Sequence, residues 1–262
     1  HRVGGQSILT GTPFESFLVH DGIDATSVEG LKDHAYALPN FRGELHTTQV
    51  GVPPLWWRAV GHTPTAYVME TAIDQAAIAA GADPVAYRRG LLADGDRRRG
   101  VLDAVAEMAN WTGPDAGNGR FRGVALHKSF STYVAQIAEV EIIDGAVKVH
   151  DVWCAVDCGV VVNPDNVVSQ MEGGLGYGLG AVLRNRLTIV DGAVEEGNFD
   201  LYEPLRMADM PRVHVTIVPS TEAPTGVGEP GTPPIGPAVA NAIFAATGTL
   251  PTTPPFSSIG LS

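Results

Sequence analysis

A single charged residue, Glu229, stands in a stretch of glycine and proline at residues 226–237. Glycine permits sharp turns and close approach, and proline fixes φ and removes an amide donor, so the stretch predicts a rigid loop. Residues 238–248 are apolar on nearly every side and end in glycine, which predicts a buried helix behind that loop. Burial raises the pKa of a carboxyl group towards the range that suits a general base. Glu229 is therefore our candidate base, with a surface glutamate on a structural turn as the alternative.

Glycine also marks a second stretch, residues 167–183, which predicts a helix that carries Gln170. A glycine weakens an isolated helix by about 1 kcal/mol relative to alanine. Glycines at this density therefore indicate that something packs very close to the helix backbone. Two explanations stay open: a sheet packed tightly against the helix, or a bulky ligand or cofactor. The glycines concerned are Gly173, Gly174, Gly176, Gly178 and Gly180.

Other reactive side chains give weaker indications. If the run 152–158 is a strand, Cys154 and Cys158 share a face but lie about 13 Å apart at the usual rise per residue, which is too far for a disulfide. No further cysteine completes a metal-ligand set, so buried thiols are expected. The run Arg97–Arg99 is expected to be a solvated surface patch, because it is short and the chain is acidic.

Composition narrows the classes of partner. The 262 residues carry a net charge of −12, which argues against nucleic acid or an anionic membrane surface as partner. No uncharged apolar run reaches the ~18 residues of a membrane span, and no signal peptide is visible after His1. Because the first residue is not methionine, we expect a processed chain or a piece of a longer one.

The hydrophobic pattern changes period near residue 120, from helical repeats to the alternation of strands. This order predicts an α+β fold, with mixed sheets packed with helices, in two portions: 1–115, an N-terminal part with helices, and 116–262, a C-terminal α+β part that carries Glu229. Asp144-Gly145 predicts a tight hairpin between two of the strands. The predicted helices are 64–80, with Thr63-Pro64 as N-cap and first residue, 84–92 after Asp83, and 101–111; the predicted strands are 121–127, 133–143, 147–156 and 213–218.

Three segments together resemble the molybdenum-binding subunit of the xanthine oxidase family. Gly228-Glu229-Pro230 is similar to the family's catalytic glutamate motif, and Arg58–Gly61 resembles the arginine segment that faces the molybdenum site. The stretch 156–173, with Val-Asp-Cys-Gly, Asn-Pro and Gln-Met-Glu-Gly in turn, resembles the family's cofactor-contacting strand and helix. The likeness covers most of residues 52–256. Within the family it is nearest to the C-terminal part of the isoquinoline 1-oxidoreductase beta subunit and of bacterial molybdopterin aldehyde dehydrogenase large subunits.

That resemblance implies a molybdopterin-dependent oxidoreductase that oxidises an aldehyde or an N-heterocycle with water as the oxygen source. It implies Glu229 as the catalytic general base, beside molybdenum held by molybdopterin, often as the cytosine dinucleotide. Electrons would leave through iron–sulfur clusters on a small 2Fe–2S partner subunit. No side chain of this chain is implied as a metal ligand. The cofactor-binding residues implied are Arg58, Gly61, Gln170, Gly173, Gly174 and Gly228.

Two cofactor-contacting features of the family, a Gly-Gly-Phe-Gly loop and a Thr-Gly-Gln-Gly segment, are missing from the sequence. The resemblance places both upstream of His1. We therefore expect the C-terminal part of a larger subunit, from a bacterial cytoplasm or periplasm, with the upstream portion as its partner. Val60 stands where many relatives have an aromatic residue, so substrate preference is not carried over. Two other functions stay open: a non-catalytic scaffold or assembly domain of the same fold, and a hydrolase that pairs Glu229 with Glu172.

Overall fold

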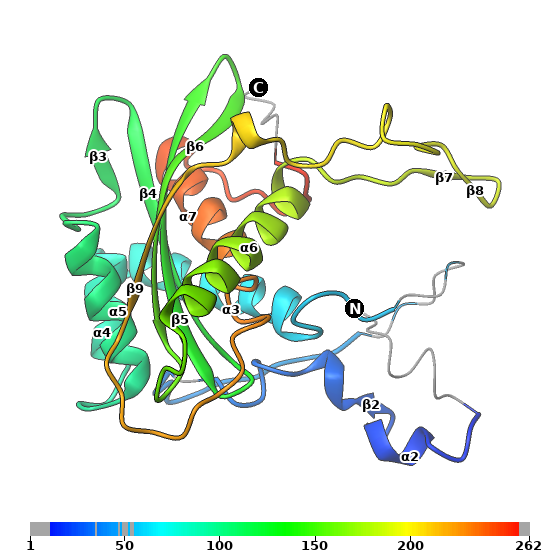
Figure 1. Cartoon of the computed structure of the whole chain (residues 1–262), viewed down its shortest axis with the longest axis horizontal. Coiled ribbons are helices and arrows are strands. Elements are labelled where there is room, and N and C mark those ends of the chain that lie inside the picture. Colours follow the sequence, from blue (N-terminus) through cyan, green and yellow to red (C-terminus); the bar gives the residue numbers. More distant parts are fainter. Residues whose placement is uncertain (1–10, 35, 47, 49–51, 53–54, 257–262) are drawn as a thin grey trace.

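The chain folds around a five-stranded sheet with helices on both faces (Figure 1). The structure is a computed structural model and describes residues 11–34, 36–46, 48, 52 and 55–256. Neighbouring strands are antiparallel except the last pair, in which β9 runs parallel to β6. This mixed sheet with packed helices confirms the predicted α+β class. In order across the sheet the strands are β3 (Asp115–Gly117), β4 (Arg120–Ser129), β5 (Thr132–Ile143), β6 (Ala146–Asp157) and β9 (Arg212–Ile217).

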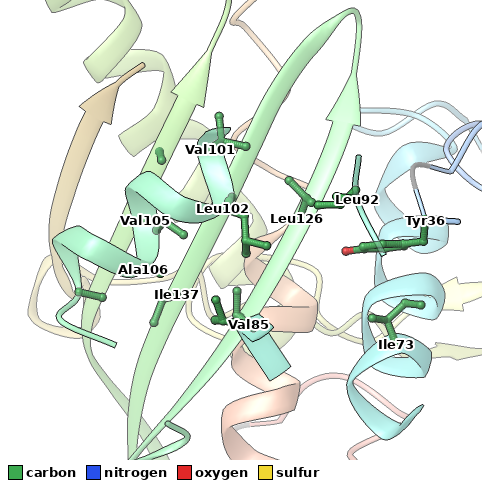
Figure 2. Close-up of a cluster of buried hydrophobic side chains, with 14 of the residues drawn as sticks. Tyr36, Ile73, Val85, Leu92, Val101, Leu102, Val105, Ala106, Leu126 and Ile137 are labelled. Carbon is green, nitrogen blue, oxygen red and sulfur yellow. The ribbon is translucent and has the colours of Figure 1, made fainter. Parts of the chain in front are cut away.

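The two faces of the sheet are covered by different helices. One face packs against α4 (Pro84–Gly90) and α5 (Arg97–Met108). The other packs against α6 (Pro164–Leu183) and α7 (Ile235–Thr247), while α3 (His62–Ala79) contacts both α7 and β4. Because helices cover both faces, the central strands β4, β5 and β6 are buried along much of their length. Figure 2 shows the first face, where Val101, Leu102 and Val105 of α5 lie close to Leu126 and Ile137.

Short elements lie outside the sheet. Before α3 come α2 (Glu15–Leu18), β1 (Val19–His20), β2 (Ile23–Asp24) and the 3₁₀ helix η1 (Ala25–Ser27). Between α6 and β9, the strands β7 (Ile189–Val190) and β8 (Ala193–Val194) form an arm that extends away from the sheet (Figure 1), followed by the 3₁₀ helix η2 (Met207–Asp209). Large apolar side chains are exposed along this segment: Leu187, Ile189, Val190, Val194, Phe199, Leu201 and Met207.

The predicted elements are found with ends that are shifted by a few residues. The prediction of Thr63-Pro64 as N-cap and first residue of a helix is wrong, because α3 begins at His62 with Gly61 as its N-cap. Helix α5 begins at Arg97 rather than 101, because the Asp96 carboxylate accepts the backbone N–H of Arg98 and caps the helix. The Asp144-Gly145 hairpin is confirmed, with φ angles of 50° and 77°.

Two expectations for individual side chains have different outcomes. Cys154 and Cys158 are free and buried, as predicted, and burial raises the pKa of Cys154 to about 12. Arg97 departs from the expected solvated patch. Its guanidinium forms a two-bonded ion pair with the buried carboxylate of Asp157, at 2.7 and 2.5 Å, and so ties α5 to the end of β6.

Candidate active site

Glu229 lies in the loop that leads into α7. The helix is apolar on every side and is buried between the sheet, α3 and α6. It begins at Ile235, three residues earlier than predicted, and ends at Thr247, with Gly248 as its C-cap at a φ of 73°. The backbone N–H of Thr232 donates to the carbonyl oxygen of Glu229 at 2.9 Å and closes a tight turn. The half-buried side chain of Glu229 therefore extends from a loop that this backbone hydrogen bond closes.

The glycines of α6 provide the surface on which this loop rests. A Cβ atom added at Gly178 would stand 2.6 Å from Cγ2 of Ile235 and 2.9 Å from the carbonyl oxygen of Thr232. One added at Gly174 would stand 3.2 Å from the backbone of Gly231. At these two positions the close neighbour is the Glu229 loop. Gly173 differs, because it is exposed and has nothing within 4 Å of its Cβ position.

Arg58 connects the loop to α6. Its Nε donates to the carbonyl oxygen of Gly228 at 2.9 Å, and its Nη2 donates to Oε1 of Gln170 at 3.3 Å. The guanidinium carbon lies 5.6 Å from the ring centroid of Tyr177, and Trp57 stacks on the same ring at 4.6 Å. These contacts bring three of the predicted cofactor-binding residues, Arg58, Gln170 and Gly228, together beside the loop that carries Glu229.

The next residue, Ala59, holds the carboxylate itself. Its backbone N–H donates to Oε2 of Glu229 at 2.7 Å. Ala59 and Val60 have φ angles of 69° and 50°, in the left-handed region. This conformation costs roughly 1–2 kcal/mol for a residue with a Cβ, so other contacts must hold the turn in place. One is Gly61, whose missing side chain lets the turn lie against the carbonyl oxygen of Thr26.

Behind this turn lies Glu29. Its Oε2 accepts the backbone N–H of Gly61 at 3.2 Å. Glu29 is half-buried, and burial raises the pKa of its carboxyl group; the Gly61 N–H lowers it, and the charges of Asp24, Asp33 and Glu229 raise it further. The turn 58–61 therefore has a carboxylate on each side, one bound at Ala59 and one at Gly61.

A buried pair of histidines consists of His62 at the start of α3 and His127 on β4. Nδ1 of His62 and Nε2 of His127 are 2.9 Å apart, so one of the two nitrogens carries the shared proton. Burial lowers the pKa of His127 to about 3, with further lowering by His62 and Arg98. Burial also lowers the pKa of His62, although Asp33 and Glu229 oppose this. The pair is therefore neutral around pH 7.

An apolar cavity of 330 Å³ adjoins the Glu229 loop. Its walls come from α3, α6 and the start of α7, and they include Trp57, Gly178 and Thr232. A cavity of this size and character is typical of small-molecule sites. Hollows of 640 Å³ lie beside Arg97 and beside His150, and neither is lined by residues of the Glu229 cluster.

Comparison with protein families assigns the fold. Residues 65–211, more than half of the chain, match the model of the molybdopterin cofactor-binding domain. The chain belongs to this molybdopterin cofactor-binding family. The match confirms the resemblance to molybdenum-binding subunits of the xanthine oxidase family that the sequence motifs indicate.

Individual relatives agree with this assignment. The chain is 37% identical over 218 residues to the isoquinoline 1-oxidoreductase beta subunit of Brevundimonas diminuta, a match over 82% of this chain and 28% of that protein. It is 31% identical to the membrane-bound pyrroloquinoline-quinone aldehyde dehydrogenase of Gluconacetobacter polyoxogenes, over 92% of this chain and 33% of that protein. The chain thus spans about a third or less of these relatives.

A solved structure supports the fold independently. Quinoline 2-oxidoreductase from Pseudomonas putida 86 superposes with a TM-score of 0.64 at 14% identity, over 73% of this chain and 50% of that one. Among the described residues, no helix is long and apolar enough to cross a membrane. Within the same residues, no group of three or more His, Cys, Asp and Glu side chains could hold a metal ion.

The donors in the cluster fit one side of a molybdopterin ligand. Gln170 presents an amide, Arg58 retains further guanidinium N–H groups, and both lie beside Gly228. The exposed backbone at Gly173 leaves room for a flat group to approach. A pterin is flat and rich in hydrogen-bonding groups, so this surface is chemically suited to its edge.

Sequence analysis missed three residues of this site. Glu29 has no motif around it, and only its contact with Gly61 reveals it. Trp57 and Tyr177 could have been suspected from their neighbours, because Trp57 precedes Arg58 and Tyr177 stands among the glycines of α6. Glu172, considered as a second carboxylate for a hydrolase, is exposed on α6 and makes no hydrogen bond with Glu229 among the described residues.

Proposed function

We propose that this chain supplies the catalytic base of a molybdopterin-dependent oxidoreductase that oxidises an aldehyde or an N-heterocycle. The observation that carries the proposal is the placing of Glu229. Its carboxylate is fixed by the Ala59 N–H, and Arg58, Gln170 and Gly228 lie around the same loop. The motifs at these positions support the same role, as do relatives named isoquinoline 1-oxidoreductase and aldehyde dehydrogenase.

The chain's own residues would hold one side of the cofactor. Arg58, Gln170, Gly173 and Gly228 would face it, while Gly61 and Gly174 would shape the site through the turn and the loop they support. When bound, the molybdenum cofactor, in its cytosine dinucleotide form, supplies the two-electron redox chemistry. Iron–sulfur clusters on a small partner subunit would receive the electrons.

Glu229 would handle the proton. Oxidation of an aldehyde to a carboxylic acid takes the new oxygen from water and releases two electrons, which the bound cofactor would accept, and two protons. The carboxylate of Glu229 would take one proton from the oxygen nucleophile as it attacks the carbonyl carbon. The Ala59 N–H, at 2.7 Å from Oε2, would keep that carboxylate pointed in one direction. The apolar cavity beside Trp57 and Thr232 would take the body of the substrate.

The rest of a larger subunit is the proposed partner. The chain spans 28% of its isoquinoline oxidoreductase relative, so most of such a subunit lies outside it. The arm of β7 and β8 exposes apolar side chains, and an isolated two-stranded hairpin is only marginally stable in water. Contact with the missing portion would cover these side chains and complete the cofactor site.

The decisive test is Glu229→Gln in the complete enzyme. Glutamine is nearly isosteric but cannot accept the proton, so we expect unchanged molybdenum content and turnover lowered at least ~10²-fold, a barrier higher by about 2.7 kcal/mol. Glu172→Gln, an exposed position on α6, is the matched control and should retain turnover. Retained turnover in the Glu229 variant with molybdenum in place would show that Glu229 is structural. Analysis of the same preparation for molybdenum, pterin and pyrroloquinoline quinone identifies the cofactor directly.

A further inference from the structure

We propose that Glu29 is a positioning residue for Glu229, acting through the turn at residues 58–61. The inference rests on the proposed role of Glu229 as base. Glu29 accepts the N–H of Gly61 at 3.2 Å, and Glu229 accepts the N–H of Ala59 at 2.7 Å. The two carboxylates thus bind N–H groups two residues apart on one short turn, and a shift of one would move the other.

The turn requires such support because its backbone is unfavourable. Ala59 and Val60 are both left-handed, and Val60 is β-branched, which disfavours that region further. The N–H of Val60 donates to the carbonyl oxygen of Trp57, and the N–H of His62 donates to that of Ala59. These local bonds shape the turn, and the Arg58 side chain joins it to the carbonyl oxygen of Gly228 in the Glu229 loop.

The segment that carries Glu29 gives the turn a second anchor. Asp24 caps η1 by accepting the backbone N–H of Thr26 at 2.9 Å and its hydroxyl at 2.6 Å. The carbonyl oxygen of Thr26 then fills the space that a side chain on Gly61 would need. Thr65 of α3 donates its hydroxyl to the carbonyl oxygen of Glu29. Residues 24–29 are therefore held against the turn at Gly61 and against α3 at Thr65, and the Glu29 carboxylate adds a second contact to Gly61.

The charges around Glu29 also favour a role in the site over a surface role. The Glu29 carboxyl group is half-buried, and both its burial and the charges of Asp24, Asp33 and Glu229 disfavour its ionised form. His62, on the other side of the turn, is affected by the charges of Asp33 and Glu229 as well. No arginine or lysine is hydrogen-bonded to Glu29 among the described residues. Its specific partner in the structure is the Gly61 N–H.

Three substitutions in the complete enzyme separate a positioning role from a merely structural one. Glu29→Gln keeps an oxygen that accepts the Gly61 N–H, Glu29→Ala removes the acceptor, and Glu29→Asp keeps the charge but withdraws the acceptor by one methylene. We expect kcat to fall roughly 10–100-fold in the alanine and aspartate variants, with KM and molybdenum content unchanged, and to stay near the parent value in the glutamine variant. Glu107→Ala, an exposed carboxylate on α5, is the control.

Amide hydrogen exchange supplies a readout that does not depend on turnover. In the alanine and aspartate variants, the peptide that contains residues 58–62 should exchange faster, while exchange in α5 stays unchanged. Parent-like kcat and exchange in both variants would overturn the proposal, as would equal losses of kcat in the glutamine and alanine variants. If Glu229→Gln lowers turnover but Glu29→Ala leaves kcat unchanged, this inference alone fails. If Glu229→Gln retains turnover, the proposed function fails, and hydrogen exchange still decides whether Glu29 holds the turn.

Discussion

Ala59 donates its backbone N–H to the carboxylate of Glu229 at 2.7 Å, across 170 positions of sequence. The donor is fixed by a turn that leads directly into α3, and the acceptor by a loop that leads directly into α7. Because α3 and α7 pack together, the turn before α3 and the loop before α7 lie close enough for this hydrogen bond. The site is thus a consequence of helix packing, and its geometry is as rigid as the core behind it.

The strain at Ala59 can be measured. Ala59→Gly should relieve about 1–2 kcal/mol of left-handed strain while losing about 0.8 kcal/mol from a buried methyl, so the free energy of unfolding should be unchanged or higher. Ala72→Gly, at an exposed position within α3, should lower that free energy by about 1 kcal/mol. Denaturant unfolding of the two variants makes the comparison, and equal losses would argue against a strained turn.

The packing of α6 on the Glu229 loop gives a second prediction. Gly178→Ala introduces a methyl 2.6 Å from Ile235 and should destabilise the fold by about 1–3 kcal/mol, although alanine is the better helix former. Gly173→Ala meets no atom within 4 Å and should stabilise the helix by about 1 kcal/mol. Thermal unfolding should therefore move in opposite directions for two alanines on one helix. Stabilisation by Gly178→Ala would mean that the loop does not rest on α6.

These two variants also show how far the sequence could predict the site. The loop at Glu229, the helix after Asn163 and the segment at Arg58 each have a local pattern that can be recognised. Whether glycines in α6 face a ligand or the protein depends on tertiary packing, and it differs between Gly173 and Gly178. A composition pattern cannot distinguish the two.

The contacts of the turn 58–61 lay beyond sequence analysis for another reason. A valine in left-handed backbone contradicts its local preference, so no propensity argument would place Val60 there. Such departures are stabilised by distant groups, here Glu29 and Glu229, and they are concentrated at functional sites. The early start of α5 has a simpler cause, because the Asp96 side chain caps that helix, whereas the N-cap residues of α3 and α7 make no side-chain cap hydrogen bond.

Buried histidine predicts how stability depends on pH. The pKa of His127 is about 3 in the folded chain and near 6.5 in an unfolded one, so only the unfolded chain takes up the proton between these values. The stability contributed by neutral His127 is complete above pH 6.5 and is lost towards pH 3, at up to about 1.4 kcal/mol per pH unit. His127→Gln should flatten this part of the profile, whereas His20→Gln at an exposed position should leave the slope unchanged. Equal slopes for His127→Gln and the parent chain would contradict a buried neutral histidine.

The cavity beside the Glu229 loop gives a prediction about substrate size. Ala181 of α6 lines it, and Ala181→Leu would fill part of its 330 Å³ without touching Glu229 or Arg58. If the cavity takes the body of the substrate, kcat/KM for an aromatic aldehyde should fall roughly 10–100-fold, while that for acetaldehyde should change little. Ala208→Leu, which lines one of the larger hollows, serves as the control and should affect neither substrate. Equal effects on both aldehydes would mean that the cavity is a packing defect, and the substrate would then have to approach Glu229 from the side of Gly173.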